Sequence, residues 1–195
     1  MLKICSNIKS NLKLFLLFLI AVVYLKGLQA QTWIALGSGL EFPINTFTVH
    51  NGNLFAGSDA VYKWDGSSWT GMNEGLSSLF GGAIYALAVS NGGNLYCGGT
   101  GFFVLTPDLN FYNYAGRWNG NKWTTVGDGT GNYRSGMNEF VSVMTSYNGV
   151  LIAGGNFGSA GGDPLYPTDV YYIASFAGTS CCWSALGTGM NDVVR

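Results

Sequence analysis

Few residues of this sequence are of the types that carry out catalysis. The 195-residue chain has a single histidine, His50, and four cysteines, Cys5, Cys97, Cys181 and Cys182. The cysteines lack the spacing of a zinc site, and no phosphate-binding glycine loop or paired nucleophile and base is recognisable. The sequence therefore predicts a protein that is not an enzyme and that has no metal site or cofactor.

The cysteines are compatible with more than one state. Cys97 lies in the alternating run NLYCGG, which favours a thiol buried in the core. Cys181 and Cys182 are adjacent, so they form either a strained vicinal disulfide or two separate thiols at a strand end. If Cys5 is removed with a signal peptide, the odd number that remains implies a free thiol or an intermolecular bond.

Two long segments between expected strands are the candidates for ligand binding, at 100–111 and 156–170. In the second, Asp163, Tyr166 and Asp169 could contact a sugar or Ca²⁺. Loops on a rigid scaffold are where binding residues concentrate. A solvated loop between strands, without a ligand, is the alternative for the same residues.

The first 30 residues have the layout of a secretory signal peptide. Lys3, Lys9 and Lys13 precede the apolar run LFLLFLIAVVYL at 14–25, and Ala30 is a small residue suited to cleavage. This run is shorter than the roughly 20 residues that a membrane-spanning helix needs, and a retained anchor is the alternative. We expect a secreted or cell-surface protein that contacts a membrane only through an uncleaved signal helix.

Composition and charge narrow the class further. The chain has 30 glycines, 15% aromatic residues and only 10% charged residues, whereas about 25% charged is usual. Removing 1–30 takes away four of nine basic residues and none of the ten acidic ones, which leaves a net charge of −5. Nucleic-acid binding requires a basic stripe, and we expect no such partner.

The sequence repeats itself at an interval of about 50 residues. Trp33, Trp69, Trp123 and Trp183 each begin a similar phrase, as in WIALGSGL and WSALGTGMN, and 150 residues separate the first from the last. A repeat of this length is typical of propeller blades and related arrays.

Each repeat contains two hairpin signals. The first is Asn-Gly within an apolar run, in HNGNLFAGS (50–58), SNGGNLYCGG (90–99) and YNGVLIAGG (147–155). The second is Asp-Gly or Asn-Gly between tryptophans, in WDGSSW (64–69) and WNGNKW (118–123). These dipeptides tolerate the two positive φ angles of a two-residue hairpin turn. Two hairpins give a four-stranded antiparallel sheet.

The paired tryptophans have two interpretations, a stacking platform for a ligand or structural packing between neighbouring sheets. In the third repeat Phe176 replaces the first tryptophan, while Trp183 is kept. A plain apolar ring substitutes more readily in packing than in binding. We therefore expect the rings to be structural.

The repeats resemble those of kelch-type, galactose-oxidase-like propellers, and more closely a degenerate repeat of secreted bacterial surface proteins. Gly98-Gly99 and Gly154-Gly155 carry this resemblance, with the aromatic residues that follow them. The first repeat departs from it, with Gly57-Ser58 in place of a diglycine. The copper chemistry of galactose oxidase needs two histidines, and the resemblance therefore does not extend to activity here.

The resemblance implies an all-β, partial β-propeller with blades at about 40–71, 83–127 and 140–187, following the signal peptide at 1–30. We expect the incomplete propeller to occupy 31–195, with a lone strand at about 32–37. Burial of the tryptophans and of the strand residues Ile84, Leu87 and Val143 is expected to drive folding. A two-sheet sandwich is the alternative fold.

Function is then expected to be recognition without catalysis. A secreted propeller would display loops for a protein or a glycan. One alternative is a fragment of a larger propeller without independent function, whose open edges would pair with missing blades or with a second copy. An enzyme with a propeller fold is the last alternative.

Overall fold

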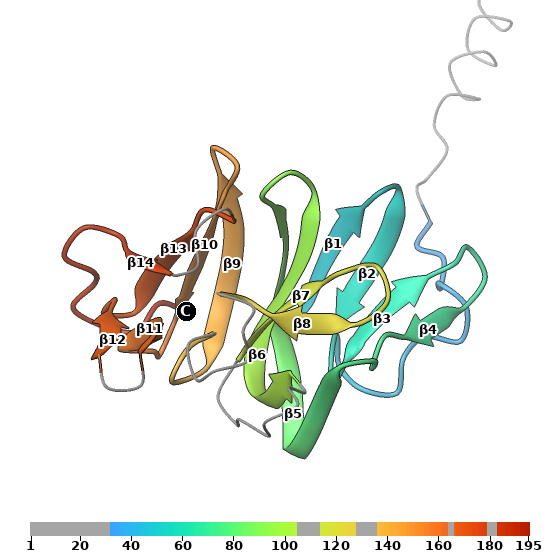
Figure 1. The fold of residues 1–195 in the computed structure, drawn as a ribbon. Coiled ribbons are helices and arrows are strands. Elements are labelled where there is room, and N and C mark those ends of the chain that lie inside the picture. The colour runs from blue at the N-terminus through green and yellow to red at the C-terminus, as the bar shows by residue number, and fades with distance from the viewer. Residues whose placement is uncertain (1–31, 105–113, 128–135, 164–165, 179–182) are drawn as a thin grey trace, which may run out of the picture. The chain divides into compact units, whose positions relative to one another are not determined.

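The structure is a computed structural model that describes residues 32–104, 114–127, 136–163, 166–178 and 183–195 (Figure 1). The expected signal helix at 1–30, and Cys181 and Cys182, lie outside these ranges. All regular secondary structure in the described residues is β-strand, which confirms the all-β class. No helix in these ranges is long and apolar enough to span a membrane.

Twelve of the strands form three four-stranded antiparallel sheets, each built from strands in chain order. The first sheet consists of β1 (Thr46–His50), β2 (Asn53–Gly57), β3 (Val61–Trp64) and β4 (Trp69–Gly71). The second consists of β5 (Leu76–Ser90), β6 (Asn94–Val104), β7 (Ala115–Trp118) and β8 (Trp123–Thr125). The third consists of β9 (Val141–Tyr147), β10 (Val150–Gly155), β13 (Ile173–Phe176) and β14 (Ser184–Ala185). The two strands β11 (Ser159–Asp163) and β12 (Tyr166–Asp169) form a separate hairpin between β10 and β13.

The first hairpin of each sheet turns at the predicted Asn-Gly dipeptide. In the first sheet Asn51 has φ of 49° and Gly52 of 74°, and in the third Asn148 has 50° and Gly149 has 80°. Positive φ at both central residues matches the right-handed twist of the flanking strands. These local sequences therefore fix the register of β1 with β2 and of β9 with β10.

The second hairpin turns around an Asp or Asn side chain. The Asp65 carboxylate accepts hydrogen bonds from the backbone N–H groups of Ser67 and Ser68, both at 2.7 Å. Asn119 plays the same part in the second sheet, where its Oδ1 accepts from the N–H groups of Asn121 and Lys122. These bonds hold the pKa of Asp65 well below its usual range, because they stabilise the ionised form.

We expect the Asp65 turn to make the first sheet sensitive to acid. Because the folded-state pKa is lowered, the stabilisation is present above the unfolded value and is lost as the pH falls below about 4. Asp65→Asn should keep the turn, as Asn119 does, and should remove this dependence. Melting temperatures measured from pH 6 to pH 2 check this; parallel curves for the wild type and the variant would contradict it.

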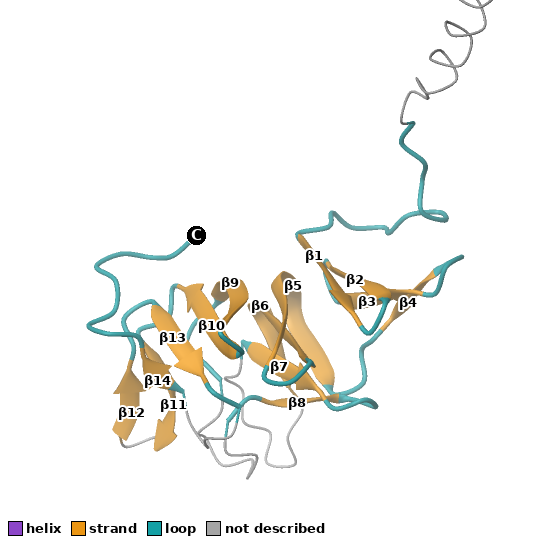
Figure 2. Cartoon of the chain, turned by 90° about the horizontal axis from the view of Figure 1, so that it is seen from above, coloured by secondary structure: helices purple, strands orange, loops and turns teal. Residues whose placement is uncertain are grey.

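The sheets pack against one another with their first strands as neighbours. Strand β5 lies between β1 and β9, and the later strands of each sheet follow outward from them (Figure 2). A glycine in the second strand of a sheet leaves room for a branched side chain of the next sheet. A Cβ added to Gly57 would lie 2.7 Å from Cγ2 of Ile84, and one added to Gly98 would lie 2.7 Å from Cγ1 of Val141. The sheet faces can therefore approach closely.

The tryptophans of the fourth strands are structural, as predicted. Trp123 and Trp183 are each 1% exposed. The indole N–H of Trp123 donates to the carbonyl oxygen of Met72 in the preceding sheet, at 2.8 Å, and that of Trp183 donates to Val126 in the same way, at 3.2 Å. Each tryptophan thus joins two sheets. Trp69, with no preceding sheet in the described chain, is only half-buried.

The aromatic pairs around the second hairpin also repeat. The ring centroids lie 5.3 Å apart in Trp64–Trp69, 5.5 Å in Trp118–Trp123 and 5.4 Å in Phe176–Trp183. Tilted and edge-on contacts at this separation are the favoured geometry for aromatic pairs. Phe176 therefore substitutes for a tryptophan without a change in packing, as the sequence indicated.

Several expectations are wrong in detail. Residues 32–36 form no strand, and 37–38 lie in a turn, because a strand exists only where a neighbour shares its hydrogen bonds. Val143 is 40% exposed, whereas Ile84 and Leu87 are buried as expected. Val143 occupies the position of Ala86, which the third sheet covers, and no sheet in the described chain covers the third.

The two expected long loops are also partly strand. The segment 156–170 contains the β11–β12 hairpin, and β6 extends into 100–111 as far as Val104. The described strands form three four-stranded sheets, unlike a two-sheet sandwich. Cys97 is a free thiol with no exposed surface, and burial raises its pKa because it disfavours the thiolate.

Candidate functional site

The first strands of the second and third sheets each contain a β-bulge at the same place. Tyr85 has no partner in the β5–β6 register, which steps from Ile84↔Gly99 to Ala86↔Gly98. Ser142 likewise lies between Val141↔Gly155 and Val143↔Gly154. A bulge turns the side chain of its extra residue away from the regular alternation of the strand.

Close approach at the bulge explains the diglycine. A Cβ on Gly99 would overlap the carbonyl oxygen of Ala83, and one on Gly155 would overlap that of Phe140. The first sheet has Ser58 at this place, and its hydroxyl donates to the carbonyl oxygen of Pro43 at 2.8 Å. Serine is therefore accommodated by a hydrogen bond to the carbonyl that corresponds to those of Ala83 and Phe140.

Asn45 and Arg195 occupy the same repeat position as the two bulge residues. Asn45 precedes Thr46, which pairs with Gly57 as Ala86 pairs with Gly98, and its N–H donates to the Gly57 carbonyl at 2.8 Å. Arg195 follows Val194, whose Cγ1 would lie 2.7 Å from a Cβ on Gly154, as Val141 does at Gly98. One repeat position therefore occurs four times, each time as a branched aliphatic residue followed by a cavity residue: Ile44-Asn45, Ile84-Tyr85, Val141-Ser142 and Val194-Arg195.

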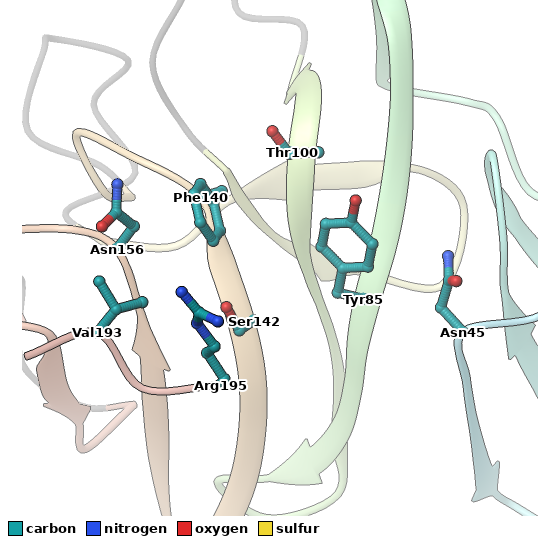
Figure 3. Close-up of a pocket in the computed structure, with 8 residues that line it drawn as sticks. All are labelled: Asn45, Tyr85, Thr100, Phe140, Ser142, Asn156, Val193 and Arg195. Carbon is teal, nitrogen blue, oxygen red and sulfur yellow. The ribbon is translucent and has the colours of Figure 1, made fainter.

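These four residues line one cavity of about 730 Å³. Figure 3 shows them with the other lining side chains. Among the described residues, the lining consists of Asn45, Tyr85, Thr100, Phe140, Ser142, Asn156, Val193 and Arg195. The volume lies within the range of small-molecule sites, about 300–1,000 Å³.

A second repeat position contributes to the cavity. Thr100 and Asn156 each follow the diglycine of their sheet, and Asp59 stands at the equivalent place in the first sheet. Asp59 lines an adjoining cavity of about 450 Å³ that shares Asn45 and Tyr85 with the first. Asp59 accepts a hydrogen bond from the Tyr62 hydroxyl. Burial, together with this hydrogen bond, raises the pKa of Tyr62 to about 12.

The chemistry of the larger cavity is polar, with two aromatic rings. Figure 3 shows the rings of Tyr85, on β5, and of Phe140, which immediately precedes β9. Asn45 uses its amide N–H to bind the Ile84 carbonyl at 3.2 Å. The side chains of Tyr85, Ser142 and Arg195 make no hydrogen bond within the part of the chain that the structure describes. Their donors and acceptors are available to a ligand, and Arg195 is the one charged side chain among the lining residues that the structure describes.

The residues proposed from sequence lie elsewhere, on the β11–β12 hairpin. Asp163 pairs with Tyr166 next to the turn, and Asp169 pairs with Ser159 at the other end of the hairpin. The side chains of Asp163 and Tyr166 lie outside the description, and Asp169 is exposed. The backbone thus places Asp163 and Asp169 at opposite ends of the hairpin. No group of three metal-binding side chains occurs among the described residues.

The sequence did contain a signal for the cavity, which the search for loops missed. When the repeats are aligned on Gly39, Gly136 and Gly189, the residue before the cavity position is always isoleucine or valine, while the cavity residue changes from Asn to Ser to Arg. A position that varies between repeats, next to one that stays aliphatic, indicates a side chain that is exposed for binding. No family model and no curated protein matches this sequence.

Proposed function

We propose that the chain is a non-catalytic recognition module that binds a polar ligand in the cavity at the bulges. The observation that carries this proposal is the convergence of four copies of one repeat position, Asn45, Tyr85, Ser142 and Arg195, on one cavity. The repeated sheet packing supports a further proposal, that the three sheets are successive blades of a kelch-like propeller.

A glycan is the ligand class that the lining suits best. Asparagine amides and serine or threonine hydroxyls both donate and accept hydrogen bonds, as sugar hydroxyls do. The rings of Tyr85 and Phe140 supply apolar surface for the C–H face of a sugar ring.

The lining also supports a role without catalysis. Its eight described residues include no carboxylate, histidine or cysteine side chain that would act as a general base beside Ser142. We further propose export, on the layout of residues 1–30, so that the module acts outside the cell. N-terminal sequencing of secreted protein should begin at or near Gln31, and a sequence beginning at Met1 would refute the cleavage.

Glycan-array screening of residues 31–195, followed by calorimetry on the best ligand, tests the proposed site. Tyr85→Ala should weaken binding about tenfold or more, as truncation of a central aromatic contact does. Tyr171→Ala is the matched control, because Tyr171 is 52% exposed and does not line the cavity. Binding that survives Tyr85→Ala and Asn45→Ala, or no glycan binding at all, would overturn the proposal.

A further inference from the structure

The two interfaces between sheets use the same set of contacts. The first is a branched side chain against a glycine, Ile84 at Gly57 and Val141 at Gly98. A second contact is the indole hydrogen bond that Trp123 and Trp183 make to the preceding sheet. These contacts involve the facing surfaces of consecutive sheets.

A third contact joins the hairpins at the other end of the first strands. His50 Nε2 donates to the Gly93 carbonyl at 2.6 Å, and the Ser90 hydroxyl donates to the Gly149 carbonyl at 3.0 Å. His50 and Ser90 are the last residues of β1 and β5. Tyr147, the last residue of β9, is the next in this series and is 68% exposed.

The outer face of the third sheet has these contact positions without a sheet to fill them. Val143 is 40% exposed, although its equivalent in the second sheet, Ala86, is 3% exposed. Leu186, whose carbonyl corresponds to the indole acceptors of Met72 and Val126, is 44% exposed. This face is therefore built to receive a further sheet.

The outer face of the first sheet presents the complementary half. Phe47 is 54% exposed, whereas its equivalents Leu87 and Met144 are 6% and 7% exposed against the preceding sheet. Trp69 is half-buried, whereas Trp123 and Trp183 are 1% exposed. The first sheet thus has every group that the second and third use to pack on their predecessors.

We propose that the outer face of the third sheet binds the first sheet of a second copy of this chain, head to tail. In the pair, Phe47 of the second copy covers Val143, and the Trp69 indole N–H of the second copy donates to the Leu186 carbonyl. The Tyr147 hydroxyl donates to the Asn51–Gly52 hairpin. The occupant follows from continuity, because this interface repeats the two that the chain already contains.

The C-terminal segment 190–195 lies where the second copy must enter. Val194 already sits against Gly154 in the place that Ile84 and Val141 take at their glycines. The corresponding residue of the second copy is Ile44, which is 38% exposed. Docking therefore exchanges Val194 for Ile44, and the segment 190–195 leaves the face in the paired state. Arg195 then leaves the cavity, and Asn45 of the second copy, which stands at the same repeat position, takes its place there.

Head-to-tail contacts either close into a ring or extend into a filament. Two copies supply six four-stranded sheets, which lies within the range of about four to eight at which propellers close. Closure by two copies rests on the proposed propeller arrangement, whereas head-to-tail pairing rests only on the repeated contacts.

The experiment uses two single variants of residues 31–195, which contain the compact unit 36–195. Val143→Asp places a charge on the outer face of the third sheet, and Phe47→Asp places one on that of the first. Each variant alone should be monomeric in light scattering after size exclusion, at concentrations where the wild type self-associates. Both positions are exposed in the single chain, and the variants should therefore fold normally. Circular dichroism checks that they do.

Mixing the two variants decides the geometry. The Phe47→Asp variant keeps an unaltered outer face on its third sheet, and the Val143→Asp variant keeps one on its first sheet. These two faces can still pair, and the mixture should therefore form a one-to-one dimer. Three results would each overturn the proposal. The wild type is monomeric at every concentration, the single variants associate as the wild type does, or the mixture remains monomeric. Loss of glycan binding with dimerisation intact would instead affect only the proposed function.

Discussion

Replacing Trp123 with alanine is expected to lower the free energy of unfolding by about 3–5 kcal/mol, as removal of other large buried aromatic side chains does. The ring is 1% exposed in the cluster between the first and second sheets. Its loss leaves a cavity there and also removes the hydrogen bond to the Met72 carbonyl. Chemical denaturation, monitored by the backbone signal in far-ultraviolet circular dichroism, measures the change in the free energy of unfolding.

Trp69→Ala is the matched control for this prediction. Trp69 has the same place in its sheet and the same aromatic partner distance, but it is half-buried and joins no preceding sheet in the single chain. We expect the free energy of unfolding to fall by about 1 kcal/mol, which is the centre of the distribution for point substitutions. The measurement is made in dilute protein, where the chain is monomeric. Equal losses at the two positions would contradict the role of Trp123 between sheets.

Gly99→Ala is expected to destabilise the protein by at least about 2–3 kcal/mol, at the upper end for overpacking of a rigid interior. The added Cβ would overlap the Ala83 carbonyl oxygen, which is backbone and cannot rotate away. Relief requires separation of β5 from β6 at the bulge, and this displaces Tyr85. The variant should therefore also lose ligand binding in the cavity.

Gly158→Ala provides the control, because a Cβ at Gly158 would meet no atom within 4 Å and its φ is not in the left-handed region. Such a substitution is neutral or slightly stabilising, since it restricts the unfolded chain. Thermal unfolding of both variants checks the pair. A Gly99→Ala variant as stable as Gly158→Ala would show that the bulge does not require glycine.

The sequence alone was enough to predict the features that depend on neighbouring residues. Asn51-Gly52 and Asn148-Gly149 turn where predicted because only such dipeptides adopt two positive φ angles cheaply, and Asp65 and Asn119 fix the second turn by local hydrogen bonds. Repetition of these turns at intervals of about 50 residues then predicted three four-stranded sheets. The burial of Trp123 and Trp183 followed from the same repetition, because each repeat packs on its neighbour in one way.

Tertiary structure decided which residues come together and which remain uncovered. The cavity joins Asn45, Tyr85, Ser142 and Arg195, which are up to 150 residues apart, because the bulges of separate sheets meet where their first strands lie side by side. Val143 is as apolar as Ile84, yet it is exposed, because burial depends on whether a further sheet covers that face. Local sequence sets the shape of a strand and the hand of a turn, but exposure and convergence depend on the packing of distant sheets.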